Sequence, residues 1–174
     1  MSTYEVTIGI PVYNVEKYIR LAMDSALAQT FDDIEFLICD DCGTDSSMDI
    51  IREYQQMHPR GKDIRIVCQP RNMGIGEGRN RIVKEAQGRY LFFLDGDDTI
   101  TANAIQLLYD AAQSYNAQVV YGSHRRIEFL DDEVEVEHRN LLEIHKFHVK
   151  GIDFCDCLLI KLVAEYIDVR LDFF

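Results

Sequence analysis

The stretch "YLFFLDGDD" at residues 90–98 decides the fold, because an apolar and aromatic run stops abruptly at three carboxylates within four positions. A short, continuous apolar run bounded by a turn signal is typical of a strand buried on both faces of a parallel sheet. In such sheets, ligands bind beyond the carboxyl ends of the strands. We therefore expect the residues that follow each strand to carry the chemistry of this protein.

The remainder of residues 1–125 alternates strand and helix patterns. Strands are predicted at "VTIGIPV", "IEFLIC", "DIRIVCQ" and "AQVVYGS". Amphipathic helices are predicted at "EKYIRLAMDSALAQT" behind an Asn14 cap, at Ser46 to Gln56, at "GEGRNRIVKEAQG" and at Thr101 to Ser114. Repeated strand and helix units predict an α/β fold, in which a mostly parallel, Rossmann-like sheet carries helices on both faces.

Residues 126–174 have a different pattern but are interpreted as part of the same domain, since ~100 to 200 residues usually fold as one unit. "RRIEFLDDEVEVEHR" alternates charged and apolar residues, which predicts a small hairpin that turns at Asp131 and Asp132. The tail "GIDFCDCLLIKLVAEYIDVRLDFF" predicts an amphipathic C-terminal helix. Exposed apolar positions on that helix would suit a homodimer or a membrane surface.

Composition narrows the possible functions. The chain has 174 residues, with 30 acidic and 18 basic side chains and a net charge of -12. This balance argues against broad electrostatic binding to nucleic acid, so an anionic ligand would need a local source of positive charge. Five cysteines, an odd number, several of which lie inside apolar runs, predict reduced, mostly buried thiols. Neither a secretion leader nor a run of ~18 apolar residues is found, which predicts a soluble, cytoplasmic chain.

The acidic turn at 95–98 has two interpretations. Closely packed carboxylates repel one another, and a divalent cation such as Mg²⁺ or Mn²⁺ would offset the charge of Asp95, Asp97 and Asp98 while also binding phosphate oxygens. Alternatively, the turn is only solvated, and Asp98 or Thr99 caps the helix that follows.

The second and third strands are also followed by polar residues. In "DDCGTDSS", Asp40 and Asp41 could accept hydrogen bonds from a ligand, whereas Asp45 or Ser46 suits the N-cap of the next helix. "NMGIGEGRN" lacks both the spacing and the position of a dinucleotide-binding fingerprint. Arg79 within it could bind a base carbonyl or a phosphate, or could cover the surface with its aliphatic stem.

Four motifs together carry a family resemblance. "IPVYN" at 10–14, "DDCGTD" at 40–45, "NMGIGEGRN" at 72–80 and "DGDD" at 95–98 resemble, in order and spacing, the family 2 glycosyltransferases of GT-A fold. The resemblance implies transfer of a sugar from a nucleotide-diphospho-sugar, commonly a UDP-sugar, with inversion and with Mg²⁺ or Mn²⁺. It also implies a saccharide or lipid-linked acceptor and a role in polysaccharide biosynthesis, in the cytoplasm or at the inner face of the membrane.

The resemblance also implies roles for individual residues. Asp40 and Asp41 would contact the donor, with Asp41 bonded to the base, and Arg79 would read the base from the opposite side. The expected nucleobase pocket is lined by Pro11 and Tyr13. In the acidic motif, Asp95 would contact the ribose or the metal, Asp97 would be the main metal ligand, and Asp98 is a weaker candidate.

Two departures from the family pattern leave alternatives open. The first is that Cys42 and Gly43, followed by Thr44, stand where Gly-Ser is usual in the family. The second is that the general base of the reaction is not identified. The acceptor region is therefore expected to be truncated. Unassigned acids in the tail are Asp153, Asp156, Glu165 and Asp168. One alternative is therefore a catalytically incomplete nucleotide-sugar-binding module. A nucleotidyltransferase is a weaker alternative, because "PVYNVEK" lacks the glycine-rich basic loop expected after the first strand.

Overall fold

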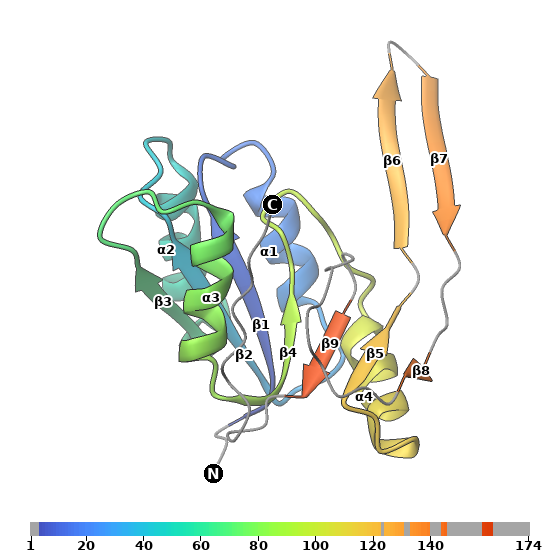
Figure 1. Ribbon diagram of the computed structural model, residues 1–174. Helices are drawn as coiled ribbons and strands as arrows, with labels where there is room; N and C mark the ends of the chain where they lie inside the picture. The colour runs from blue at the N-terminus through green and yellow to red at the C-terminus, as the bar shows by residue number, and fades with distance from the viewer. Residues whose placement is uncertain (1–3, 123, 131–132, 140–143, 146–157, 162–174) are drawn as a thin grey trace.

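The computed structural model describes residues 4–122, 124–130, 133–139, 144–145 and 158–161, and its centre is a seven-stranded sheet (Figure 1). The strand order is β3-β2-β1-β4-β9-β5-β8. The strands are β1 (Tyr4–Val12), β2 (Ile34–Asp40), β3 (Ile64–Cys68), β4 (Gly88–Phe93), β5 (Val119–Tyr121), β8 (Ile144–His145) and β9 (Leu158–Lys161). Strands β3, β2, β1 and β4 are parallel, which confirms the mostly parallel sheet.

Helices cover both faces of the sheet, as predicted. The larger apolar cluster joins the sheet to α1 (Ile19–Leu27), α2 (Ser47–Met57) and α4 (Ala104–Ser114). The smaller cluster joins the opposite face to α3 (Ile75–Glu85), and a short 3-10 turn, η1 (Gly61–Asp63), precedes β3. The two clusters give the central strands an apolar core on each side.

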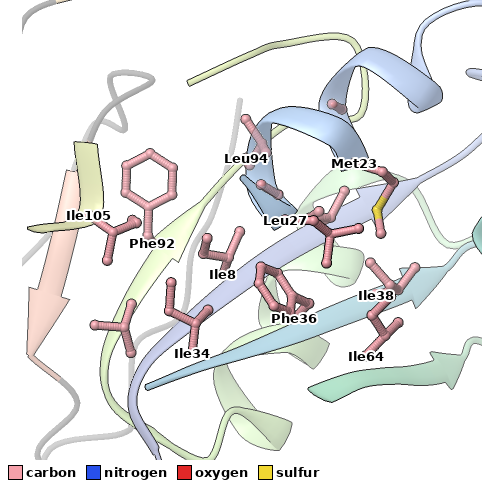
Figure 2. Close-up of a cluster of buried hydrophobic side chains, with 14 of the residues drawn as sticks. Ile8, Met23, Leu27, Ile34, Phe36, Ile38, Ile64, Phe92, Leu94 and Ile105 are labelled. Atoms are coloured by element: carbon pink, nitrogen blue, oxygen red, sulfur yellow. The ribbon is translucent and has the colours of Figure 1, made fainter. Parts of the chain in front are cut away.

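Alternation along β2 explains how one strand serves both clusters. Ile34, Phe36 and Ile38 belong to the larger cluster, whereas Leu37 and Cys39 belong to the smaller one. Figure 2 shows the larger cluster, in which Phe36 and Ile38 lie under Met23 and Leu27 of α1 with Ile8 of β1. Successive side chains of a strand point to opposite faces, so a strand covered on both sides is a continuous apolar run.

Helix α3 approaches β1 closely because of a glycine in the strand. A Cβ placed on Gly9 would clash with Cγ2 of Ile82, which is fully buried on α3. Nearer the amino end of α3, a Cβ on Gly78 would lie 3.6 Å from Cβ of Pro11, an ordinary van der Waals distance. The first half of α3 therefore packs directly on the carboxyl half of β1.

A buried carboxylate ties together the other end of the sheet. Glu35 at the start of β2 is 1% exposed. Its Oε2 accepts hydrogen bonds from the Thr7 hydroxyl at 2.7 Å and the Gln87 amide at 2.8 Å, and its Oε1 accepts one from Nε of Arg65 at 2.7 Å. A buried charge needs such partners to offset its lost hydration. This network lies at the amino ends of β1, β2 and β4.

The predicted hairpin is present as β6 (His124–Leu130) and β7 (Glu133–Arg139), which pair antiparallel in a separate two-stranded sheet. The predicted turn at 131–132 lies outside the described residues. Leu158–Lys161, which the sequence predicts to be helical, instead form β9, antiparallel to β4 and β5. A short apolar run suits a buried strand as well as a helix, and here it supplies both neighbouring strands with backbone partners. The remainder of the predicted C-terminal helix lies outside the described residues.

Candidate functional site at the carboxyl ends of the strands

The loops that carry the predicted site residues meet at one end of the parallel sheet. In the register of β1 and β2, Val12 pairs with Asp40, so Tyr13 and Asp41 follow neighbouring strand ends. On the other side of β1, the amide of Leu94 donates to the carbonyl of Gly9 at 3.0 Å, and Asp95 follows directly. The fold therefore brings these three candidate positions to the same end of adjacent strands, as the parallel arrangement predicts.

Arg79 and Asp95 form an ion pair with each other. Nη2 of Arg79 lies 2.8 Å from each carboxylate oxygen of Asp95, and both side chains are largely buried. The guanidinium also lies 6.0 Å from the centroid of the Phe93 ring. This pair joins α3 to the acidic turn after β4 and places a cation beside a carboxylate of that turn.

Asp41 is buried and binds backbone amides of a distant loop. Its Oδ1 accepts a hydrogen bond from the Met73 amide at 2.7 Å, and its Oδ2 accepts one from the Gly74 amide at 2.9 Å. The side chain therefore lies between the end of β2 and the loop that leads into α3. The predicted contact of Asp41 with a base stays a prediction.

The other predicted donor-binding residues differ in accessibility. Tyr13 is 46% exposed, so its ring is available to a ligand. Pro11 lies beneath Gly78 of α3. Asp40 accepts a hydrogen bond from the Cys42 amide at 2.9 Å, which closes its own turn. Of these three side chains, Tyr13 is the one that the fold leaves most open to a planar base.

Asp97 is suited to bind a divalent metal ion that enters the site together with a phosphate-bearing ligand. The side chain is exposed and makes no hydrogen bond or ion pair with the part of the chain that the structure describes. Within those ranges, no group of three or more His, Cys, Asp or Glu side chains could hold a metal ion. Mg²⁺ and Mn²⁺ commonly bind through one or two carboxylates and complete their shell with water and phosphate oxygens. Asp97, with Asp95 two residues away, fits that requirement.

The turn after β2 contains a backbone conformation that glycine would favour. Cys42 has a φ of 59°, and its thiol lies 3.2 Å from the carbonyl of Gln69.

Cys42 and Cys68 are exposed, so the expectation of mostly buried thiols holds only for Cys39 among the cysteines that the structure describes. Burial raises the pKa of the Cys39 thiol to about 11, so this thiol stays protonated near neutral pH.

The loops after β1 and β2 are interlocked by reciprocal hydrogen bonds. The Glu16 amide donates to Oδ2 of Asp45 at 2.9 Å, and the Ser46 amide donates to Oε2 of Glu16 at 3.0 Å. Asn14 does not cap α1, because its Oδ1 accepts the Thr44 amide at 2.7 Å and the residue has a φ of 53°. Sequence reasoning missed Glu16, since neither loop by itself indicates its partner.

Of the two N-cap candidates for α2, Ser46 occupies the N-cap position but its side chain makes no capping hydrogen bond, whereas Asp45, one residue earlier, accepts the Ser47 amide through Oδ1 at 3.0 Å. Partial burial alone would raise the pKa of Asp45, but hydrogen bonds from Ser47 and the Glu16 amide lower it below its ordinary value. The charged form thus stabilises the fold above the unfolded pKa of ~3.9, and this contribution is lost as pH falls through the folded pKa.

We therefore expect Asp45→Asn to lower the free energy of unfolding at pH 7, by a difference that shrinks below about pH 4 as the wild-type carboxylate is protonated. Urea unfolding of both proteins at pH 7, 5 and 3 measures this difference. Asp110→Asn on the exposed side of α4 is the control for loss of one charge. A deficit that stays constant at all three pH values would show that the charge of Asp45 is not what stabilises the loops.

The four acids without an assigned role lie outside the described residues, so the general base stays unidentified; they are Asp153, Asp156, Glu165 and Asp168.

A membrane-spanning helix is absent from the described ranges, where every helix is too short or too polar to cross a bilayer.

Comparisons with known proteins agree on one family and one fold. The family model described as "Glycosyl transferase family 2" matches residues 7–159. Chondroitin synthase of Escherichia coli is 39% identical over 124 residues, which is 71% of this chain but only 18% of that protein.

Two solved structures share the fold. TarS 1-349 of S. aureus in complex with UDP-GlcNAc has a TM-score of 0.64 at 24% identity, covering 74% of this chain and 36% of that one. The mannosyltransferase PcManGT of Pyrobaculum calidifontis, in complex with GDP-Man and Mn²⁺, has a TM-score of 0.59 at 22% identity, covering 71% and 36%.

Proposed function

Because this chain belongs to glycosyl transferase family 2, we propose that it transfers a sugar from a nucleotide-diphospho-sugar, with a UDP-sugar as the first choice, to a saccharide or lipid-linked acceptor. We further propose that the transfer inverts the anomeric carbon, is assisted by Mg²⁺ or Mn²⁺, and serves polysaccharide biosynthesis on the cytoplasmic side of the membrane. Family membership confirms the resemblance found in the sequence. The donor, the metal and the acceptor are supported by what related proteins bind and make, namely UDP-GlcNAc in TarS, GDP-Man with Mn²⁺ in PcManGT, and chondroitin.

The observation that carries the proposal is the convergence of Tyr13, Asp41, Arg79 and Asp95 at the carboxyl ends of β1, β2 and β4. An exposed aromatic ring can stack on a base, and hydrogen-bonding side chains beside it can read the base edge. The Arg79 cation offsets the charge of Asp95, so an anionic donor meets less repulsion here than the net charge of -12 suggests.

Asp97 has a separate role in this proposal. Its exposed carboxylate would hold the divalent ion against the diphosphate of the donor, with Asp95 as a second candidate. The ion, when bound, neutralises negative charge that develops on the departing nucleoside diphosphate. Asp95 is oriented by Arg79, so its carboxylate is held in place before any donor arrives.

Calorimetric titration tests the proposal directly. UDP, GDP and dTDP are each added to the chain with Mn²⁺ and again with a chelator. We expect one of the three to bind with Mn²⁺ and to bind at least about 10-fold more weakly without it, a difference of about 1.4 kcal/mol. Failure of all three to bind would contradict the proposal. A nucleotide that binds without any turnover of its sugar donor would favour the catalytically incomplete binding module instead.

A further inference from the structure

Asp41 makes a connection that base recognition does not require. The side chain is 4% exposed, and each of its two oxygens accepts one of two consecutive amides, those of Met73 and Gly74. Hydrogen bonds to an ionised carboxylate are roughly twice as strong as those between neutral groups. A buried charge with two such bonds is therefore a strong attachment point for the loop that joins β3 to α3.

The loop that joins β3 to α3 has an uncommon backbone conformation, so it needs contacts that hold it in place. Gly74 has a φ of 84° and a ψ of 163°, a conformation that residues with a side chain rarely adopt. A Cβ at this position would meet nothing within 4 Å, so the need for glycine is one of backbone conformation and not of space. The carbonyl of Gly74 then accepts the Gly78 amide at 3.1 Å, and α3 begins at the next residue. The Gly74 amide also donates to Oδ1 of Asn72 at 3.0 Å, so Asp41 and Asn72 together hold the residue that precedes α3, and the Met73 amide is bound by Asp41.

The position of α3 decides whether Arg79 reaches Asp95. Arg79 lies on α3, one residue after Gly78, whose Cβ position faces Pro11 of β1. A shift in the first turn of the helix would move Arg79 relative to the acidic turn after β4, where its Nη2 lies 2.8 Å from both oxygens of Asp95. Asp41 on β2 and Asp95 after β4 are therefore connected through the loop and the helix.

We propose that Asp41 is a positioning residue: it holds the Met73–Gly74 loop so that α3 presents Arg79 to Asp95. The inference rests on the proposed function and states how the donor site is assembled before the donor binds. It does not replace the predicted contact with the base, because each carboxylate oxygen has a second lone pair. The bonds to the loop amides fix the orientation of the Asp41 carboxylate, and therefore the direction in which its remaining lone pairs point.

Three variants separate loop positioning from direct base binding. Asp41→Asn keeps the shape of the side chain but leaves one oxygen for two amides, so one loop bond is lost. Gly74→Ala disturbs the loop through its positive φ while leaving Asp41 intact. Gly76→Ala is the matched control, because Gly76 lies in the first turn of α3 without a positive φ, and alanine favours helices.

The first readout is amide hydrogen exchange at Met73 and Gly74 without nucleotide, with urea unfolding to exclude global destabilisation. We expect protection of both amides at least about 10-fold above that of a freely exposed amide in the wild-type chain. It should be reduced for at least one of the two amides in Asp41→Asn, lost in Gly74→Ala and kept in Gly76→Ala. Unprotected amides in the wild-type chain would overturn the proposal.

The second readout is the dissociation constant of the preferred nucleotide with Mn²⁺. We expect Gly74→Ala to weaken binding about 10-fold, Asp41→Asn to weaken it at least as much, and the double variant to be no weaker than Asp41→Asn alone. Wild-type affinity in Gly74→Ala, despite lost amide protection, would also overturn the proposal. If the wild-type chain binds no nucleotide, the proposed function fails, whereas the exchange measurement still decides whether Asp41 holds the loop.

Discussion

Replacing Asp97 with alanine is expected to abolish metal-dependent nucleotide binding and to leave the fold intact. The side chain is exposed and bonds to none of the described residues, so its removal costs the fold little, within about 0.5 kcal/mol. Loss of the main metal ligand removes the ion that offsets the diphosphate charge. We expect a loss on the order of 3 kcal/mol, or about 100-fold in affinity.

Calorimetry with Mn²⁺ and with chelator measures this effect. The affinity of Asp97→Ala in Mn²⁺ should fall to the value that the wild-type chain shows in chelator. Asp110→Asn, which removes an exposed charge on α4, should bind like the wild type. Undiminished affinity of Asp97→Ala in the presence of metal would refute the metal assignment. Asp97→Asn should behave like the alanine variant, since a neutral amide is a poorer ligand for a hard cation.

Replacing Glu35 with alanine is expected to be the most destabilising change at the amino ends of the strands. The variant leaves the Thr7 hydroxyl, the Gln87 amide and the Arg65 guanidinium without the carboxylate that they share. Removing one partner of a buried ion pair typically costs about 3 to 5 kcal/mol, because the remaining groups stay buried and unsatisfied. Arg65 keeps its ion pair with Glu85 at 3.2 Å and is partly exposed, so we expect a loss near the lower value.

Urea unfolding of Glu35→Ala measures the loss, and the surface pair between Arg20 and Glu53 supplies the control. Both side chains of that pair are about half exposed, at 53% and 56%. Exposed ion pairs contribute little to stability, so Glu53→Ala should lower the free energy of unfolding far less than Glu35→Ala does. Equal losses for the two variants would show that the buried network contributes no more than a surface ion pair.

Much of the sheet could be predicted because its strands are buried on both faces. The runs that contain Ile8, Phe36 and Phe92 are continuous and apolar, and the rule that ligands bind at the carboxyl ends of parallel strands then located the site. Apolar content alone could not assign β9, since a strand of four residues has the composition of a helix segment.

The contacts within the site could not be predicted from local patterns. The ion pair of Arg79 with Asp95 and the bonds of Asp41 to the Met73 and Gly74 amides join segments that lie 16 to 33 residues apart. Asp41, Arg79 and Asp95 are candidates because they lie in the segments that follow strands, but the partner of each depends on how α3 packs on β1. The close approach of Ile82 to Gly9, which seats the helix, follows from three-dimensional packing.

The place of β9 between β4 and β5 has a consequence for how the chain folds. Strand β4 ends at Phe93, yet its partner Leu158–Lys161 lies more than sixty residues later in the sequence. During synthesis, β4 and β5 therefore remain unpaired along the facing sides until that late segment emerges, and unpaired strands recruit other chains. Closing such a long loop is slow, so insertion of β9 is expected to be the late step in folding and the period of greatest risk of aggregation.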